Sequence, residues 1–284
     1  MIPEQPMILE SIHIYPVKGL RGISMPAATV EPCGLQGDRR WMVVDPAGRY
    51  LTQRDLPGMA RILATPAGEG AMDGAIILTA DGTEPLHVPV PDATAPAAIR
   101  PAPVRIWRDH VPACSAGGDA AAWLTSALGR PCHLVHLSDP AARPVDPAYG
   151  HPGDRVSFAD GFPLLVVNTA SLDDLNARLA QPVPITRFRS NLVVSGAAPW
   201  AEDGWQRLRV GRIAFRAVKP CTRCSVITTD QDTGARAPDR EPLRTLATLR
   251  PDAGGRALFG QNLVPDTLGR LAVGMPVATQ PGAG

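Results

Sequence analysis

The sequence VKPCTRCSVITTD, residues 218–230, places Cys221 and Cys224 three positions apart between two runs typical of β-strands. RIAFRAV at 212–218 precedes the pair, and SVITT at 225–229 follows it with β-branched residues that favour extended backbone. The pattern predicts a strand, a turn over KPCTR and a second strand. Cys224 is then expected where the turn meets the second strand.

Four roles for this pair remain open from the residues alone. A structural zinc site needs four ligands, and only the distant, adjacent Cys132 and His133 could complete the set. A thioredoxin-like dithiol needs a helix after the reactive thiol, whereas the β-branched run predicts a strand. Cys224 could act alone as a soft ligand to a metal in a cleft, with Lys219 and Arg223 favouring its thiolate form. Both cysteines could also be small apolar core residues.

The rest of the chain continues the β-rich pattern. Turn signals such as DPAGR and ADGTEP separate short runs with strand character. The strands are predicted at 7–15, 41–44, 75–80, 164–168, 191–196, 212–218 and 225–229. Two helices are predicted, at 118–129 and at 169–180, the second with Thr169 or Ser171 as N-cap and acidic residues in its first turn.

This balance of elements predicts an α+β, mainly β protein, with a β-barrel as its architecture. The Pro- and Ala-rich stretch 88–104 predicts a long loop, and the Pro- and Gly-rich stretch 139–154 predicts a domain junction. The division that we expect is 1–130 and 131–284.

Composition narrows the partners and the compartment. The 284 residues are 44% hydrophobic and 19% charged with a net charge of +1, which indicates a globular protein without a field that attracts nucleic acid or a membrane. The N-terminus lacks a signal-peptide pattern, and the apolar runs are too short to span a bilayer. Five cysteines with one close pair favour a reducing compartment, so a cytoplasmic location is predicted.

Several predicted strand ends carry groups that bind anions. RFRSN at 187–191 places Arg187, Arg189 and Asn191 at alternate positions, on one face if the backbone is extended. The loop after the first strand offers Lys18, and a later one offers Arg39. Together with a thiolate, these groups suggest a phosphorylated cofactor that carries a metal. Walker and Rossmann glycine patterns are absent from the sequence.

Seven segments, in this order, resemble the MOSC family, and within it the branch of the mitochondrial amidoxime-reducing component and its bacterial relatives. They are IYPVKGLRG, GLQGDRRWMVVD, RFRSNLVVSG, WQRLRVG, KPCTRCSVITTDQDTG, EPLRTL and FGQN. The resemblance runs from about residue 8 to about residue 277. It implies an N-terminal β-barrel-like domain, a MOSC β-barrel domain with a few helices, and a molybdenum cofactor (molybdopterin with Mo) in the cleft between them. It also carries the family's generic association with pyridoxal phosphate.

The resemblance also implies residue roles. Cys224 is the molybdenum ligand and the catalytic residue, with Cys221 as its neighbour. The expected contacts to the pterin and its phosphate are Lys18, Gly19, Arg39, Asp160, Gly161, Arg189, Asn191 and Thr222. Two positions depart from the family pattern: Gly19 stands where a hydroxyl residue follows the lysine, and Gly161 stands where threonine follows the aspartate. Any phosphate contact at Gly19 is therefore expected from its backbone N–H.

The implied activity is reduction of small N-hydroxylated compounds, such as amidoximes, hydroxamic acids and N-hydroxylated bases. No cysteine follows Cys224, so no iron–sulfur cluster is expected in this chain. Electrons are expected from a separate flavoprotein or a ferredoxin- or cytochrome-type protein. The alternative is a carrier that holds molybdenum cofactor or sulfur on a reactive cysteine without turnover.

Overall fold

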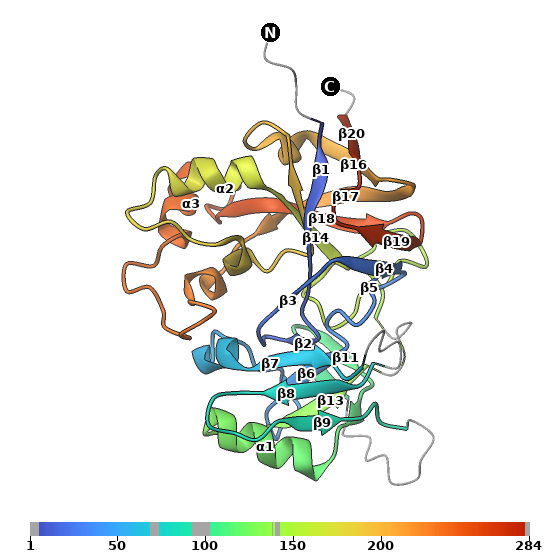
Figure 1. The fold of residues 1–284 in the computed structure, drawn as a ribbon, viewed down its shortest axis with the longest axis vertical. Coiled ribbons are helices and arrows are strands. Elements are labelled where there is room, and N and C mark those ends of the chain that lie inside the picture. Colours follow the sequence, from blue (N-terminus) through green and yellow to red (C-terminus); the bar gives the residue numbers. More distant parts are fainter. Residues whose placement is uncertain (1–5, 69–73, 93–102, 138, 140–142, 282–284) are drawn as a thin grey trace.

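The computed structural model describes residues 6–68, 74–92, 103–137, 139 and 143–281. The chain forms two lobes, one above the other in Figure 1, and the first and last strands, Ile8–Ile14 and Val277–Pro281, both reach the top of the upper lobe. Strands predominate, and the described residues contain three α-helices. The predicted α+β, mainly β class is confirmed.

A curled eight-stranded sheet builds the upper lobe. Its order is β20 (Val277–Pro281), β16 (Trp205–Val210), β17 (Ile213–Thr222), β18 (Leu258–Pro265), β14 (Leu164–Asn168), β15 (Leu192–Ser195), β1 (Ile8–Ile14) and β3 (Ile23–Met25). The first strand of the chain thus pairs with β15, from the second half of the sequence. A smaller sheet lies beside it, in the order β19 (Gly269–Ala272), β4 (Ala27–Glu31) and β5 (Gly34–Leu35).

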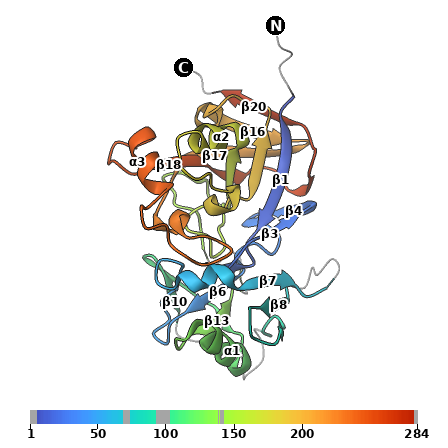
Figure 2. The same cartoon turned by 60° about the vertical axis from the view of Figure 1, so that its left-hand side comes forward.

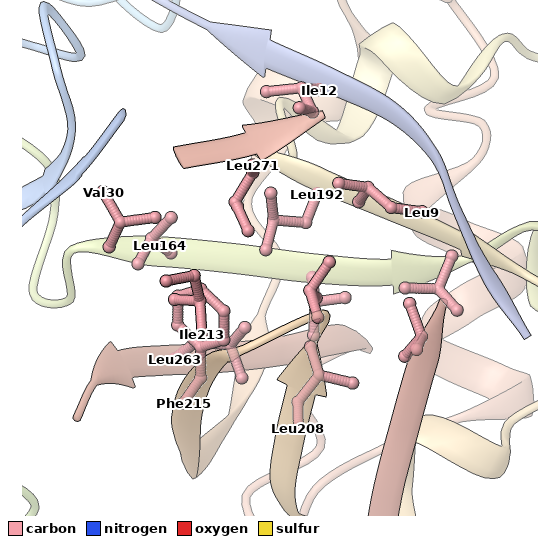
Figure 3. Packing of buried hydrophobic residues seen from close by; sticks show 14 of the residues in the cluster. Leu9, Ile12, Val30, Leu164, Leu192, Leu208, Ile213, Phe215, Leu263 and Leu271 are labelled. Atoms are coloured by element: carbon pink, nitrogen blue, oxygen red, sulfur yellow. The ribbon is translucent and has the colours of Figure 1, made fainter. Parts of the chain in front are cut away.

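The core of the upper lobe lies between these two sheets. Strand β1 buries Leu9, Ile12 and Ile14, and β14 buries Leu164 and Val166. Figure 3 shows side chains from both sheets converging on the space between them. Burial of each such side chain contributes about 1.5–3 kcal/mol.

Three small sheets build the lower lobe. They are β12 (Cys114–Ser115), β13 (His133–His136), β6 (Trp41–Val44) and β2 (Val17–Lys18); β7 (Leu63–Pro66), β8 (Ile76–Thr79) and β9 (Leu86–Val88); and β10 (Val104–Ile106) with β11 (Asp109–Val111). Figure 2 shows helix α1 (Gly118–Leu128) at the end of this lobe farthest from the upper lobe. Leu124 of α1 is buried in the lobe's core, and Gly129 ends the helix in the left-handed conformation.

Both predicted helices are present, although the second differs in detail. Helix α2 (Thr169–Asn176) is capped by Asn168, whose side chain accepts a hydrogen bond from the Ala170 backbone N–H, so neither Thr169 nor Ser171 is the cap. Its first turn carries no acidic residue, contrary to our prediction. The remaining helical elements are α3 (Leu243–Leu249) and the 3-10 helices η1 (Pro57–Arg61), η3 (Ile185–Phe188), η4 (Ala201–Gly204) and η5 (Ser225–Thr228). No helix in the described ranges is long and apolar enough to cross a membrane.

The segment around the cysteines corrects two predictions. The predicted turn at 219–223 is mostly strand, because β17 continues to Thr222 and pairs with β18 through two register shifts. Pro220 is tolerated there because the pairing of β17 with β16 ends at Arg216, so the missing N–H costs no hydrogen bond on that side. The predicted strand at 225–229 is the 3-10 helix η5. Ile227 and Thr228 of this helix are buried, and Ile227 packs into the core beside α3.

The two predicted loops lie partly outside the described residues. In the first, 88–104, residues 93–102 are outside, and in the second, 139–154, residues 140–142 are outside. Residues 143–154 form no helix or named strand and connect the lower lobe to β14. All five cysteines carry free thiols.

Candidate functional site

A cleft between the lobes gathers most of the predicted site residues. The lower lobe and the loops next to it contribute Lys18, Gly19, Arg39 and Arg54. The upper-lobe wall comes from the loop before β14, the turn after η3, and the end of β17 with the residues that follow it. The residues from these three segments include Asp160, Gly161, Arg189, Asn191, Cys221, Thr222, Arg223 and Cys224. All eight residues predicted to contact the cofactor, and Cys224, therefore line one cavity.

Cys221 and Cys224 differ in their surroundings although both line the cleft. Cys224 is exposed, at the start of η5. Its position is fixed from both sides, because the Arg223 backbone N–H donates to Ala257 O at 2.8 Å and the Ile227 N–H donates to Cys224 O at 3.2 Å. Cys221 is half-buried, packs against the apolar cluster around α2 and α3, and accepts a hydrogen bond from Arg223 Nη1 at 3.0 Å. Of the two thiols, that of Cys224 is therefore the more accessible to a ligand in the cleft.

Cys132 lies far from this pair. It is buried in the core cluster of the lower lobe, whereas Cys221 packs against a cluster of the upper lobe. A four-ligand zinc site that combines them has no support in this arrangement.

Lys18 and Asp160 form an ion pair within the cleft. Their Nζ and Oδ1 atoms are 2.5 Å apart, and the side chains are 8% and 71% exposed. Burial lowers the pKa of the Lys18 ammonium, although Asp160 opposes that shift. The surrounding cleft wall partly desolvates the Asp160 carboxylate and works against its charge, but the Lys18 charge and hydrogen bonds from Lys18 and Trp107 outweigh this effect and hold the pKa of Asp160 well below its usual range.

Arg143 holds the loop that carries Asp160. Its guanidinium is buried, is paired with Asp109 at 2.9 Å, and donates to the backbone carbonyls of Ser157, Ala159 and Asp160. Three carbonyl contacts from one fixed guanidinium orient the turn without contacting the cleft itself. Arg143 is therefore a positioning residue, and its place in the Pro-rich stretch gave no sequence signal for this role.

Arg39 and Arg189 flank Tyr15. Each guanidinium lies 4.3 Å from the centre of the Tyr15 ring, and each residue has a positive φ, 49° for Arg39 and 54° for Arg189. Arg39 donates to Asp38 at 2.6 Å and to Arg189 O at 3.0 Å. Burial works against the charge of Arg39, but Asp38 outweighs it, so the pKa of Arg39 is raised.

Arg189 forms no ion pair with a carboxylate among the residues that the structure describes. It donates to Leu20 O at 2.7 Å and lies 3.5 Å from Gln231 Oε1. Burial lowers its pKa to about 10, so it stays charged at neutral pH. Asn191 uses its side chain within the protein: Oδ1 accepts from Arg39 and from the Leu165 N–H, and Nδ2 donates to His13 O.

The predicted alternation of Arg187, Arg189 and Asn191 on one strand face is wrong. Arg187 lies in η3, and Arg189 ends η3 in the left-handed conformation, so the backbone is not extended there. Arg187 turns away and pairs with Asp230 at 2.8 Å. Only Arg189 and Asn191 line the cleft, because the turn redirects the chain between them.

Gly19, Gly161 and Thr222 complete the predicted set. A Cβ atom on Gly19 would lie 2.8 Å from Met59 Cε, and the residue has a φ of +85°, so a side chain would be strained there. A Cβ atom on Gly161 would meet open space. Thr222 is exposed at the end of β17.

The sequence did not point to Arg54, which faces the cleft from the lower lobe. Burial lowers the pKa of its guanidinium, but the nearby Cys224 and Tyr50 outweigh this effect and raise the pKa overall. With Arg54 and Arg223, the cleft is lined by five cationic side chains and one carboxylate, that of Asp160. An exposed thiol among these charges suits a metal bound to an anionic organic group.

Comparison with known proteins shows the family of this chain. Residues 7–131 match the MOSC N-terminal beta barrel domain, and residues 153–278 match the MOSC domain. The mitochondrial amidoxime-reducing component 1 of mouse is 35% identical, over 94% of this chain and 80% of its own length. The chain belongs to the MOSC family. The predicted family is confirmed.

Two further relatives of this MOSC protein carry two different names. The human mitochondrial amidoxime-reducing component 1 is 34% identical over 94% of this chain and 81% of its own length. The molybdenum cofactor sulfurase of rice is 31% identical over 89% of this chain but only 32% of its own length. MOSC relatives are thus associated with the molybdenum cofactor.

Proposed function

We propose that this MOSC protein is a molybdenum-cofactor-dependent reductase of N-hydroxylated compounds. For an amidoxime, the N–O bond breaks, two electrons and two protons are taken up, and an amidine and water are released. The observation that carries the proposal is the exposed Cys224 thiol in a cleft lined by five cations. The identity to amidoxime-reducing components over 94% of this chain supports it.

The residues present fit the cofactor by their chemistry. Cys224 would supply the thiolate ligand, and Lys18, Arg39 and Arg189 would supply positive charge for the phosphate. Gly19 would offer its backbone N–H, while Asp160, Gly161, Asn191 and Thr222 would line the pterin. When bound, the cofactor supplies the two-electron redox chemistry, which side chains cannot supply.

The Lys18–Asp160 contact has to open before the cofactor can enter the cleft. The cavity volume is about 150 Å³, below the range of about 300–1,000 Å³ that is common for ligand sites. The Lys18–Asp160 ion pair lies within it. A phosphate would compete with Asp160 for the Lys18 ammonium, so we expect these two side chains to part on loading.

The remaining features of the proposal concern partners and organisation. We propose that electrons come from a separate flavoprotein or a ferredoxin- or cytochrome-type protein, and that the protein acts in the cytoplasm. The domain division that we propose is 1–130 and 131–284, with β1 crossing it to join the upper sheet.

A second candidate is a carrier that holds molybdenum cofactor or sulfur without turnover. It is favoured by the relatives named molybdenum cofactor sulfurase in rice and zebrafish, at 31% and 30% identity. This chain covers only 32% and 31% of those relatives. The reductase relatives match this chain over most of their length, so we place the reductase first.

The deciding experiment compares wild type, Cys224→Ala and Cys221→Ala, all expressed in a host that makes the cofactor. Molybdenum and pterin are measured per chain, and benzamidoxime reduction is followed with reduced methyl viologen as electron donor. We expect near-stoichiometric molybdenum and turnover in the wild type and in Cys221→Ala, and loss of both in Cys224→Ala. Cys221→Ala is the matched control because it removes the other thiol of the same segment.

Three outcomes contradict the reductase. Molybdenum without benzamidoxime reduction favours the carrier, and a persulfide on Cys224 or Cys221 without metal favours a sulfur carrier. A folded wild type that takes up no molybdenum from such a host rules out both molybdenum roles. Folding of each variant is checked by its circular dichroism spectrum.

A further inference from the structure

A second cavity, about 740 Å³ in volume, lies beside the Cys224 cleft. We call it the arginine groove. Its wall comes from the lower lobe, from the turn after β6, the segment leading to η1, the β10–β11 turn and the end of α1. The lining residues are Asp45, Arg49, Tyr50, Leu51, Arg54, Asp55, Arg105, Trp107, Arg108 and Arg130. The volume is in the range of about 300–1,000 Å³ that is common for small-molecule sites.

The groove concentrates positive charge. Its lining carries five arginines and two aspartates, an excess of three positive charges, in a chain whose net charge is +1. Asp45 is committed to its own turn, since it accepts hydrogen bonds from the Ala47 and Arg49 backbones and from Arg49 Nε. Arg105 donates to Trp107 O at 3.1 Å, so its contact in the groove is with a carbonyl. Guanidiniums in a concave wall suit a carboxylate or a phosphate.

Aromatic rings form part of the same wall. Trp107 is 44% exposed and has a φ of 54°, which is unfavourable for a bulky residue. Its ring lies 5.5 Å from the Tyr50 ring, and the Arg54 guanidinium lies 4.8 Å from it. An exposed tryptophan in this conformation offers a flat apolar surface next to the cations. The groove therefore combines a surface for a planar ring with charges for an oxyanion.

The groove is continuous with the cleft through two residues. Arg54 lines both cavities. Trp107 lines the groove, and its Nε1 donates to Asp160 Oδ1 at 3.2 Å in the cleft wall. A molecule that reaches Cys224 from this side therefore passes over Trp107 and Arg54.

We infer that the arginine groove is a substrate subsite that selects N-hydroxylated compounds carrying an oxyanion, a carboxylate or a phosphate, on a planar body. The inference rests on the proposed reductase function and adds a substrate class to it. Arg105, Arg108 and Arg130 bind the oxyanion, and Trp107 contacts the planar body. The N–OH group then points toward Cys224.

The test compares benzamidoxime with 4-carboxybenzamidoxime, which differs by one carboxylate. We expect wild type to show a kcat/KM about tenfold higher for the carboxylate compound, mainly through KM, and to lose this preference at high salt. Arg105→Gln/Arg108→Gln should remove the preference and leave benzamidoxime turnover unchanged. Arg212→Gln is the matched control, since this exposed arginine lies at the opposite end of β17 from Cys224.

A binding measurement separates this inference from the proposed activity. Both compounds are titrated calorimetrically into cofactor-loaded protein without an electron donor, so that no turnover occurs. Tighter binding of the carboxylate compound, lost in the double variant alone, supports the groove even if neither compound is reduced. Equal affinity and equal kcat/KM for the two compounds overturn the inference and leave the reductase intact. Loss of molybdenum from the double variant also overturns it, because the groove would then hold the cofactor.

Discussion

Arginines occupy two adjoining regions of this molecule in opposite ways. In the cleft, Arg39 and Arg189 line the cavity from positions close to Tyr15, and each donates to protein acceptors. In the arginine groove, Arg105 and Arg108 are exposed, and the nearest carboxylate to Arg108, that of Asp146, is 4.0 Å away. Arg39 and Arg189 each donate to acceptors on other segments of the chain, whereas the side chains of Arg105 and Arg108 face solvent.

The difference separates arginines that also hold the protein together from arginines whose contacts are left for a ligand. A buried charge needs its partners, so the cleft arginines join the lobes and fix the shape around Cys224. An exposed charge costs little to hold and little to remove, so the groove arginines are free to change contacts with a ligand. Stability measurements on variants of each kind can break or sharpen this distinction.

The largest effect is expected for Arg39→Met. Asp38 is 1% exposed and accepts from Arg39 and from the Tyr15 N–H, so the substitution leaves a buried carboxylate with one donor fewer. Breaking a buried pair in this way costs about 3–5 kcal/mol. The loss of stability is measured by unfolding the cofactor-free protein in urea, with tryptophan fluorescence as the probe.

The matched control for that prediction removes both charges. Asp38→Asn/Arg39→Met should unfold at a higher urea concentration than Arg39→Met alone, because no unpaired charge stays buried. A loss below about 1 kcal/mol in Arg39→Met would place Arg39 with the exposed arginines and remove the distinction.

The sequence predicted which residues line the cleft, but it did not predict the contacts that hold them in place. Lys18, Arg39, Asp160, Arg189 and Cys224 were identified from short motifs, and the structure gathers them in one cavity. The motif could not show that Asn191 is held by Arg39, Leu165 and His13, because those contacts join residues far apart in the chain. Long-range contacts of this kind leave no local pattern.

The fold shows the same limit. Strands at 41–44 and 164–168 were predicted from composition, and they are present because their residues are buried on both faces. The run 225–229 has the same β-branched composition but forms η5, where Ile227 packs into the core. A high β-propensity indicates that a residue suits a buried position. Tertiary packing then determines whether the backbone at that position is a strand or a helix.

An intermediate effect is expected from Asp160, which is exposed but ion-paired. Its pKa is depressed in the folded protein, so the stabilisation is present above the unfolded-state pKa of about 3.9 and is lost as pH falls through the folded pKa. The free energy of unfolding near pH 7 should be about 1 kcal/mol higher for wild type than for Asp160→Asn. The difference is small because solvent screens a side chain that is 71% exposed. The difference should shrink below about pH 4. Urea unfolding of both proteins between pH 3 and pH 7 measures it, and a constant difference would contradict an ionic origin.

The smallest effect is expected for Arg108→Gln in the groove. Its side chain is 90% exposed, and its single ion pair, with Asp146, spans 4.0 Å. Exposed substitutions of this kind change stability by less than about 0.5 kcal/mol. The unfolding midpoint in urea should therefore match wild type within error, as it should for Arg212→Gln. A loss as large as that of Arg39→Met would show that the groove arginines hold the lower lobe together, and a ligand would then have no free guanidinium to bind there.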